Sequence, residues 1–336
     1  MRVIQVDHTG GPEMLTASEQ PAPEPAANEV LVGVAAAGVN FIDTYQRSGA
    51  YPRDLPFVPG LEAAGTVVAV GADVAHIAEG DRVAFAQVPG SYAELVAAPA
   101  ERVVPVPAEV DDRTAAALLL QGMTAHYLTS HTFPLASGST ALVLAAAGGV
   151  GRLLVQLAKQ YGATVLATTS TDDKAEVARS AGADHVIRYR DVDMVAAVSE
   201  ATDGVGADVV YDSVGADTFH ASLDCLRPRG TMVLYGQSSG RVEPIDPQLL
   251  ATKGSLCLTR PTLAHHVADA AEFNWRASEL FEEVATQRLD VRIDRTWPLA
   301  QAAEAHRCLE AGRTTGKLLL EPETPHAARG WPASPR

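Results

Sequence analysis

A glycine-rich loop between an apolar strand and an amphipathic helix constrains the fold of this chain most. The apolar run 142–145 predicts a buried strand, and the segment 146–151 that follows it reads Ala-Ala-Gly-Gly-Val-Gly. This is a dinucleotide-binding fingerprint in which alanine replaces the first glycine. Gly148 lets the backbone approach a pyrophosphate, and Gly151 lets the helix pack closely against the strand. One face of that helix is expected to carry Val150, Leu154, Leu157 and Tyr161.

The context of the loop decides how it is read, because a plain strand-to-helix turn without a ligand can look the same. From about residue 140, apolar strands and amphipathic helices alternate at regular intervals, which is the pattern of a parallel sheet with crossover helices. The expected strands are 142–145, 164–167, 185–187, 208–211, 231–234 and 256–258. A nucleotide would bind where the first helix begins, since free N–H groups and the helix dipole point at its phosphates there. A second glycine cluster, 204–206, precedes a strand and is read as an ordinary loop.

The two ends of the chain have a different pattern of apolar residues from the middle segment. Residues 1–122 predict a β-rich module with short alternating strands at 2–6, 30–34, 65–70 and 82–85. After Pro261 the pattern predicts helices over 279–286 and 301–309 and a strand over 318–320. The last residues, 323–336, are rich in proline and have no periodicity, so we expect a disordered tail.

Charge and cysteine content exclude several classes of partner. Lys plus Arg number 26 and Asp plus Glu 41, and a net charge of −15 disfavours nucleic acid and anionic lipid. The three cysteines are far apart and form neither a disulfide framework nor a paired zinc signature. The N-terminus lacks the apolar core of a signal peptide, and no apolar stretch approaches the ~20 residues of a membrane helix. We therefore expect a cytoplasmic protein with no membrane partner.

The end of the second strand indicates which dinucleotide binds. NAD enzymes place an acidic residue there, on the ribose 2′-hydroxyl. In this chain the strand runs into Thr-Thr-Ser-Thr at 168–171, and Lys174 follows shortly after. Asp172 and Asp173 fall where a helix cap and first turn are expected, where acids are common. Hydroxyl groups and a lysine suit a 2′-phosphate, so the cofactor is predicted to be NADPH; the alternative is that Lys174 is an ordinary solvated helix residue.

Motifs along the whole chain resemble one family. They are Asn-Phe-Ile-Asp-Thr-Tyr at 40–45, Pro-Gly-Leu-Glu-Ala-Ala-Gly at 59–65, Gly-Asp-Arg-Val at 80–83, the loop 145–151, Asp-Ser-Val-Gly at 212–215 and Gly-Ser-Leu-Cys-Leu-Thr-Arg-Pro at 254–261. Together they resemble the zinc-independent quinone oxidoreductases of the medium-chain dehydrogenase/reductase superfamily, to which zeta-crystallin is similar. The resemblance implies an α/β protein with a GroES-like substrate domain, 1–122 and 262–322, and an inserted NADPH-binding Rossmann domain, 123–261. It also implies an active site in the cleft between them.

The zinc sites of the superfamily's alcohol dehydrogenases are missing. Those enzymes have a cysteine near positions 38–40 and a histidine after Gly60, and here the second place holds Leu61. We therefore predict no metal. Oxidising a simple alcohol usually needs a Lewis acid or a strong base, whereas a quinone or conjugated carbonyl is already electron-poor. The chain is accordingly expected to reduce activated acceptors.

By the same resemblance, specific residues are expected at the site. Asn40 would donate a hydrogen bond to the developing oxyanion of the acceptor or hold the nicotinamide carboxamide. Tyr45 and Tyr51 would line the acceptor slot, although either tyrosine could instead be ordinary half-buried core. The cofactor would be bound by Phe41, Ile42, Asp43, Thr44, Tyr45, Thr124, Tyr127, Gly148, Gly149, Val150, Gly151, Ser170, Lys174, Tyr189, Val214, Gly236, Gln237, Ser238 and Ser239. The family usually has asparagine where Gln237 stands, which leaves that contact open.

Two rival functions remain at this stage. One is reduction of α,β-unsaturated ketones or enoyl thioesters on the same scaffold. The other is a non-catalytic NADPH-binding or sensor protein. For all of them we expect a homodimer, because the apolar strand 256–258 should lie at the edge of the sheet, where a second copy would cover it.

Overall fold

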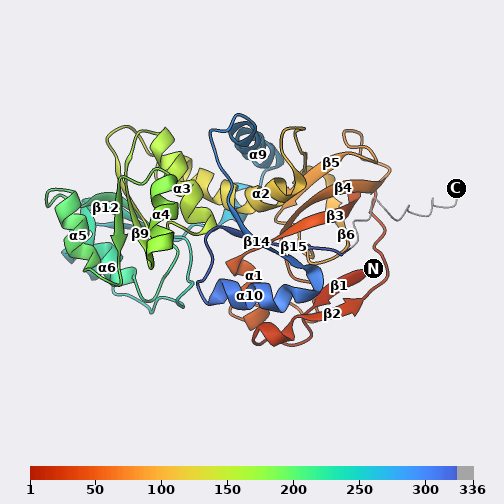
Figure 1. Ribbon diagram of the computed structural model, residues 1–336, viewed down its shortest axis with the longest axis horizontal. Helices are drawn as coiled ribbons and strands as arrows, with labels where there is room; N and C mark the ends of the chain where they lie inside the picture. The colour runs from red at the N-terminus through yellow and green to blue at the C-terminus, as the bar shows by residue number, and fades with distance from the viewer. Residues whose placement is uncertain (324–336) are drawn as a thin grey trace. The chain divides into compact units, whose positions relative to one another are not determined.

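The computed structural model describes residues 1–323, which form two compact units (Figure 1). One unit comprises Met1–Leu120 with the described residues from Val267 onwards, and the other comprises Gln121–His266. The divisions lie beside the expected domain boundaries at 122/123 and 261/262. Except for Glu323, the tail expected over 323–336 lies outside the described residues.

The first unit is built on a seven-stranded sheet that joins both ends of the chain. The strand order is β14-β15-β3-β4-β5-β7, and β6 also pairs with β3. β15 runs antiparallel to β3, with Leu319 opposite Gly38, which brings the C-terminal segment onto the N-terminal sheet. The strands are β3 (Glu29–Val39), β4 (Glu62–Val70), β5 (Arg82–Ala86), β6 (Leu95–Pro99), β7 (Val103–Pro105), β14 (Ile293–Pro298) and β15 (Lys317–Glu321).

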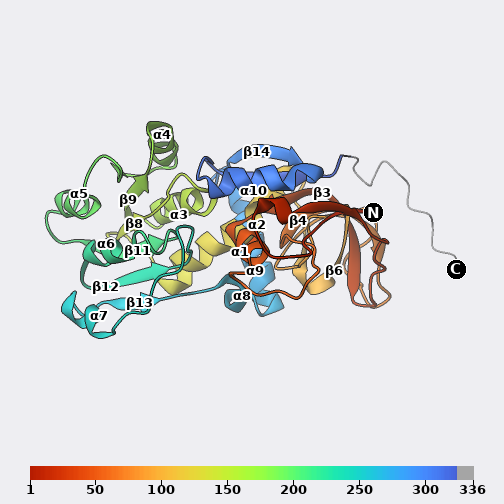
Figure 2. The same cartoon turned by 90° about the horizontal axis from the view of Figure 1, so that it is seen from below.

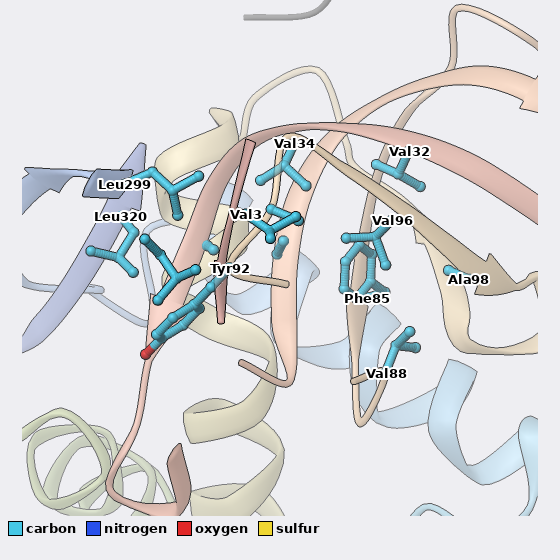
Figure 3. Close-up of a cluster of buried hydrophobic side chains, with 14 of the residues drawn as sticks. Val3, Val32, Val34, Phe85, Val88, Tyr92, Val96, Ala98, Leu299 and Leu320 are labelled. Carbon is cyan, nitrogen blue, oxygen red and sulfur yellow. The ribbon is translucent and has the colours of Figure 1, made fainter. Parts of the chain in front are cut away.

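Shorter elements complete this unit. A two-stranded antiparallel sheet pairs β1 (Arg2–Gln5) with β2 (Thr16–Glu19). Alternating valines of β3 pack with Val3, Phe85 and the ring of Tyr92 into one apolar core (Figure 3). In that view the hydroxyl oxygen of Tyr92 points away from the apolar side chains. The helices are α1 (Phe41–Ser48), α2 (Asp112–Tyr127), whose last turns belong to the second unit, α9 (Ala270–Ala285) and α10 (Ala302–Glu310).

The second unit is a six-stranded parallel sheet in the order β10-β9-β8-β11-β12-β13, and Figure 2 shows β13 at one edge. The strands are β8 (Thr140–Val143), β9 (Thr164–Thr169), β10 (His185–Arg188), β11 (Ala207–Asp212), β12 (Leu226–Leu234) and β13 (Cys257–Thr259). The helices are α3 (Gly149–Gln160), α4 (Asp172–Ser180), α5 (Met194–Ala201), α6 (Phe219–Asp224), α7 (Gln248–Thr252) and α8 (Leu263–His266). The predicted α/β class is confirmed: a GroES-like sheet domain and a doubly wound parallel sheet.

One position on the predicted face of α3 is exposed in the structure. Helix α3 ends at Gln160, and Gly162 turns the chain towards β9 with a φ of +77°. Tyr161 lies at this turn and is 37% exposed, whereas Leu154 and Leu157 on the same predicted face are buried. Tyr161 therefore stands at the exposed end of the face that it shares with Leu154 and Leu157, because it caps the helix just before the chain turns at Gly162.

Candidate active site

Several of the residues predicted to bind a dinucleotide lie beyond the carboxyl ends of the strands of the parallel sheet. From β8 the chain winds outwards through β9 to β10, and it then returns to β11 on the other side of β8. Ligands of doubly wound sheets bind at such a switch point, beyond the carboxyl ends of the strands. The segments that follow these strand ends hold Gly148–Gly151 after β8, Ser170 and Lys174 after β9, Tyr189 after β10, Val214 after β11 and Gly236–Ser239 after β12.

The glycine loop forms a close cradle at the start of α3. Gly148 is the N-cap of the helix, and its N–H donates to Ala145 O over 2.9 Å. A Cβ on Gly151 would lie 2.4 Å from Ala145 O, so the backbone leaves no room for a side chain there, whereas a Cβ on Gly149 would only require the Gln121 side chain to move. The first N–H groups of a helix have no carbonyl partner within it. This geometry fits the pyrophosphate of a dinucleotide.

A buried carboxylate organises the neighbouring loop. Asp212, at the end of β11, accepts hydrogen bonds from the N–H groups of Val214 at 2.7 Å and Gly215 at 3.0 Å. It also accepts hydrogen bonds from the hydroxyls of Thr218 at 2.7 Å and Ser222 at 2.8 Å. Sequence reasoning quoted Asp212 within a motif but gave it no role. An acid at the end of a buried strand, directly before a glycine turn, is the signal that could have found it.

The loop after β12 docks against this same segment. The N–H of Ser238 donates to Ser213 O over 3.1 Å, and that of Ser239 donates to Val214 O over 2.8 Å. A Cβ on Gly236 would lie 2.4 Å from Ser213 O, so only glycine allows this approach. The structure therefore brings Val214 together with the segment 236–239, as the prediction requires.

After the end of β9, the two acidic residues lie in the first turn of α4, and one of them forms an ion pair. Thr171 caps α4, accepting the N–H of Lys174 over 3.3 Å, and Asp172 and Asp173 form the first turn. Arg188 forms an ion pair with Asp172, which neutralises that carboxylate. The half-exposed Tyr189 follows β10, and its N–H donates to Thr169 O over 3.3 Å. The structure thus places Ser170, Lys174 and Tyr189 after neighbouring strands, and their contact with a 2′-phosphate stays a prediction.

Two further predicted contacts lie on α2. Tyr127 is buried, and its ring stacks on that of His266 with centroids 4.1 Å apart and planes 7° from parallel. Thr124 is also buried, one turn earlier on the same helix. The side chain of Tyr127 is thus packed in an interior ring pair, and its contact with a nicotinamide stays a prediction.

The predicted acceptor residues lie just before, on and just after α1. Asn40 stands just before the helix, and its N–H donates to Asp43 Oδ2 over 2.8 Å. Within the first turn the Thr44 hydroxyl donates to Phe41 O over 2.8 Å. The rings of Tyr45 and Tyr51 lie 5.2 Å apart, and the Tyr51 N–H donates to Tyr45 O over 2.9 Å. The two half-buried tyrosines therefore form one aromatic surface, and Phe41 lies next to it with its ring centroid 6.1 Å from that of Tyr45.

The amide of Asn40 belongs to a buried charged triad. Asn40 Nδ2 donates to Glu62 Oε1 over 2.7 Å, and Lys317 Nζ donates to Asn40 Oδ1 over 2.7 Å. Lys317 also forms an ion pair with Glu62, and both side chains are at most 1% exposed. The other oxygen of Glu62 accepts the N–H of Leu120 over 2.8 Å. Sequence reasoning missed Lys317, because it lies 277 residues from Asn40 along the chain.

A second buried chain of hydrogen bonds ends at Asp43. Arg47 Nη1 lies 3.2 Å from His306 Nδ1, His306 Nε2 lies 3.0 Å from the Tyr92 hydroxyl, and that hydroxyl donates to Asp43 Oδ2 over 3.0 Å. Arginine can only donate, so His306 Nδ1 accepts and a neutral imidazole carries its hydrogen on Nε2. Every bond in the chain is therefore directed towards the Asp43 carboxylate.

Burial governs the proton affinities in this second chain. Loss of solvent raises the pKa of Asp43 to about 7, although the hydrogen bonds from Asn40 and Tyr92 oppose the shift. Burial, together with the neighbouring Arg47 charge, lowers the pKa of His306 to about 3. Asp43 Oδ1 has no hydrogen-bond partner within the described residues. The side chain of Asp43 thus faces the interior, where it holds the N-terminus of α1.

Within residues 1–323, no three His, Cys, Asp or Glu side chains are grouped closely enough to hold a metal ion. Leu61, at the place where zinc enzymes have histidine, is buried. As for membranes, none of the helices in the described chain is both long enough and apolar enough to cross one.

Comparisons with known proteins agree with this architecture. Residues 26–108 match the family described as "Alcohol dehydrogenase GroES-like domain", and residues 149–276 match the family described as "Zinc-binding dehydrogenase". The chain is 44% identical over 321 residues to a quinone oxidoreductase of Pseudomonas aeruginosa, covering 95% of this chain and 99% of that protein. It is 41% identical over 323 residues to a 2-haloacrylate reductase of a Burkholderia species, covering 94% and 97%.

A solved structure gives the same result. The quinone oxidoreductase of Escherichia coli, crystallised in complex with NADPH, superposes with a TM-score of 0.94 at 43% identity, and the match covers 96% of this chain and 100% of that one. The similarity therefore extends over both units.

Proposed function

Because this chain belongs to the quinone oxidoreductases of the medium-chain dehydrogenase/reductase superfamily, we propose that it reduces quinones with NADPH by hydride transfer, without a metal ion. The observation that carries the proposal is the glycine cradle at the switch point, in a chain 43% identical to an Escherichia coli enzyme whose structure holds NADPH. NADPH-dependent oxidoreduction follows from the family. The part that goes beyond the family is the proposal that the acceptor is a quinone.

The cofactor-binding residues divide by the part of NADPH that each would hold. Gly148–Gly151 would bind the pyrophosphate through backbone N–H groups. Ser170, Lys174 and Tyr189 would hold the 2′-phosphate and adenine, and Val214 with 236–239 would border the nicotinamide ribose. When bound, NADPH supplies the hydride. The protein's own contribution is to orient the cofactor and exclude water.

The acceptor residues would work by stacking and hydrogen bonding. The adjacent rings of Tyr45 and Tyr51 provide flat apolar faces for a quinone, and each has a hydroxyl to donate. Reduction places negative charge on the acceptor oxygen, and that charge spreads over the ring. A few hydrogen-bond donors can stabilise such an anion, and no Lewis acid is required.

Metal independence has a direct test. Purified protein should contain no stoichiometric zinc, and NADPH oxidation with 1,4-benzoquinone should persist in strong chelator. Activity that is lost to chelation and restored by added zinc would contradict this part of the proposal.

A second candidate acceptor is a conjugated carbonyl compound, because the chain is also 41% identical to a 2-haloacrylate reductase. Steady-state kcat/KM should be compared for 1,4-benzoquinone, a simple enone, an enoyl thioester and 2-chloroacrylate. We expect the quinone to be preferred. A higher kcat/KM for any of the other three would reassign the substrate, and tight NADPH binding without turnover of any acceptor would favour a sensor.

A further inference from the structure

Three neighbouring strands bring together the members of the triad around Asn40. Asn40 directly follows β3, Glu62 is the first residue of β4 and Lys317 is the first residue of β15, and β3 pairs with both other strands. A Cβ on Gly38 would lie 2.4 Å from Glu62 Oε1, so the glycine of β3 leaves space for this carboxylate. The sheet register therefore places the Lys317 ammonium beside the amide oxygen of Asn40 and the Glu62 carboxylate beside its amide nitrogen.

This arrangement determines which way the amide faces. The terminal torsion of asparagine is broad and roughly two-fold, so packing alone discriminates poorly between its oxygen and nitrogen. Lysine can only donate and an ionised carboxylate can only accept. A flipped Asn40 would place Nδ2 against the Lys317 ammonium and Oδ1 against Glu62. Both contacts would then be repulsive.

From this geometry we infer that Lys317 and Glu62 are positioning residues: they hold the Asn40 amide in the one orientation in which it serves the reaction. The inference rests on the proposed function, together with the contact of Asn40 with the acceptor oxygen or the nicotinamide carboxamide that the family resemblance implies. A purely structural role explains the triad less well. Buried ion pairs contribute little to stability compared with apolar residues of similar size, so the fold alone does not call for one here.

The test removes both charges together. Lys317→Met alone would leave Glu62 buried without its partner, so the main variant is Lys317→Met with Glu62→Gln. We expect its single-turnover rate of NADPH oxidation by 1,4-benzoquinone to fall roughly tenfold or more, because small misplacements of site groups have effects of that size. The Kd for NADPH, from fluorescence titration without acceptor, should stay within about twofold, since the proposed contacts with the pyrophosphate and the 2′-phosphate are made by other residues.

Non-additivity separates positioning from independent effects. Asn40→Ala should lower the single-turnover rate by itself, and the charge-removing pair should lower it no further in that background. Glu62→Gln alone is the second variant if the pair fails to fold. It keeps the size of the side chain but accepts more weakly, so a several-fold fall is expected. Glu321→Gln is the matched control, because it removes the charge of a half-buried glutamate on the same strand, which pairs with Arg113, and it should leave the rate unchanged.

The outcomes distinguish this inference from the function on which it rests. If Asn40→Ala slows the reaction while Lys317→Met/Glu62→Gln and Glu62→Gln keep the parent rate, the positioning role is wrong and the proposed function stands. Rate losses that multiply with that of Asn40→Ala would also overturn it, because the triad would then act through another group. If Asn40→Ala itself reacts at the parent rate with every acceptor, the assignment of Asn40 to the site fails first.

Discussion

Tyr92 donates its hydroxyl hydrogen to Asp43 Oδ2 over 3.0 Å, and this bond ties the start of α1 to the core of its unit. The same hydroxyl accepts from His306, so Tyr92→Phe would leave two buried polar groups without their partner. We expect the variant to lose about 1–3 kcal/mol of unfolding free energy in urea titration. Tyr189→Phe, at a 45% exposed position, is the control and should change the unfolding free energy by less than about 0.5 kcal/mol.

The raised pKa of Asp43 predicts a pH-dependent stability. Burial raises that pKa from 3.8 to about 7, helped by Glu62 and opposed by Asn40, Tyr92 and Lys317. The folded state therefore binds the proton more tightly than the unfolded state, so this group's contribution is fully present below pH 3.8 and is lost as pH rises to about 7. The loss over these three or so units should be at most roughly 4 kcal/mol.

The comparison with Asp43→Asn isolates this effect, because Asn cannot titrate. His306 acts in the opposite direction: its pKa is lowered to about 3, so its contribution to stability is lost as pH falls. The contribution of His306 is common to the parent protein and to Asp43→Asn, so it cancels when their unfolding free energies are subtracted. A parent-minus-variant difference in unfolding free energy that stays constant between pH 4 and 7 would mean that Asp43 keeps an ordinary pKa.

Lys174 should discriminate between NADPH and NADH. Losing a charged contact with the 2′-phosphate should cost roughly 1.5–3 kcal/mol, or about ten- to a hundredfold in Kd. Lys174→Ala should therefore weaken NADPH and leave NADH nearly unchanged in fluorescence titrations. The control is Lys159→Ala on α3. The Lys159 ammonium pairs with Asp184 at 2.8 Å, so its removal should change the Kd of neither cofactor. Equal losses for both cofactors in Lys174→Ala would show that it does not contact the phosphate.

The two proposed roles at α1 can be separated by a pair of substitutions. Asn40→Ala should lower the single-turnover rate by roughly ten- to a thousandfold, towards the smaller value because a delocalised anion needs less stabilisation. Tyr45→Phe keeps the ring beside Tyr51 and removes only the hydroxyl, so its effect should be milder. With excess enzyme and deuterium at the transferring position, a primary isotope effect should accompany both. Parent rates in both variants would place the acceptor elsewhere.

We propose that β13 is a dimer interface. Among the described strands it pairs only with β12, and Cys257 and Leu258 on it are exposed. A bare apolar edge invites pairing, and two copies related by a two-fold axis would satisfy both edges. Sedimentation should show a dimer at micromolar concentration, and Leu258→Asp should convert it to a monomer. Val205→Asp, on an exposed loop, should remain dimeric; a monomeric parent protein would contradict the proposal.

The nucleotide-binding unit could be predicted from sequence because its signals are local. A strand, a glycine turn and a helix within about a dozen residues determine the cradle at 146–151, and hydrophobic periodicity identifies each strand of the sheet. The choice of NADPH depends on residues 168–174, which follow one strand directly. The helical periodicity of α3 likewise ends at its cap, Tyr161, and Gly162 then turns the chain towards β9.

The partners of Asn40 were decided only by the tertiary structure. Periodicity shows which face of a strand is buried, but it does not show which strand lies alongside it. Lys317 reaches Asn40 across 277 residues and His306 reaches Tyr92 across 214, because β15 and α10 return to the N-terminal sheet. A buried charge is stable only beside its partner, and that partner becomes visible only when the chain has folded.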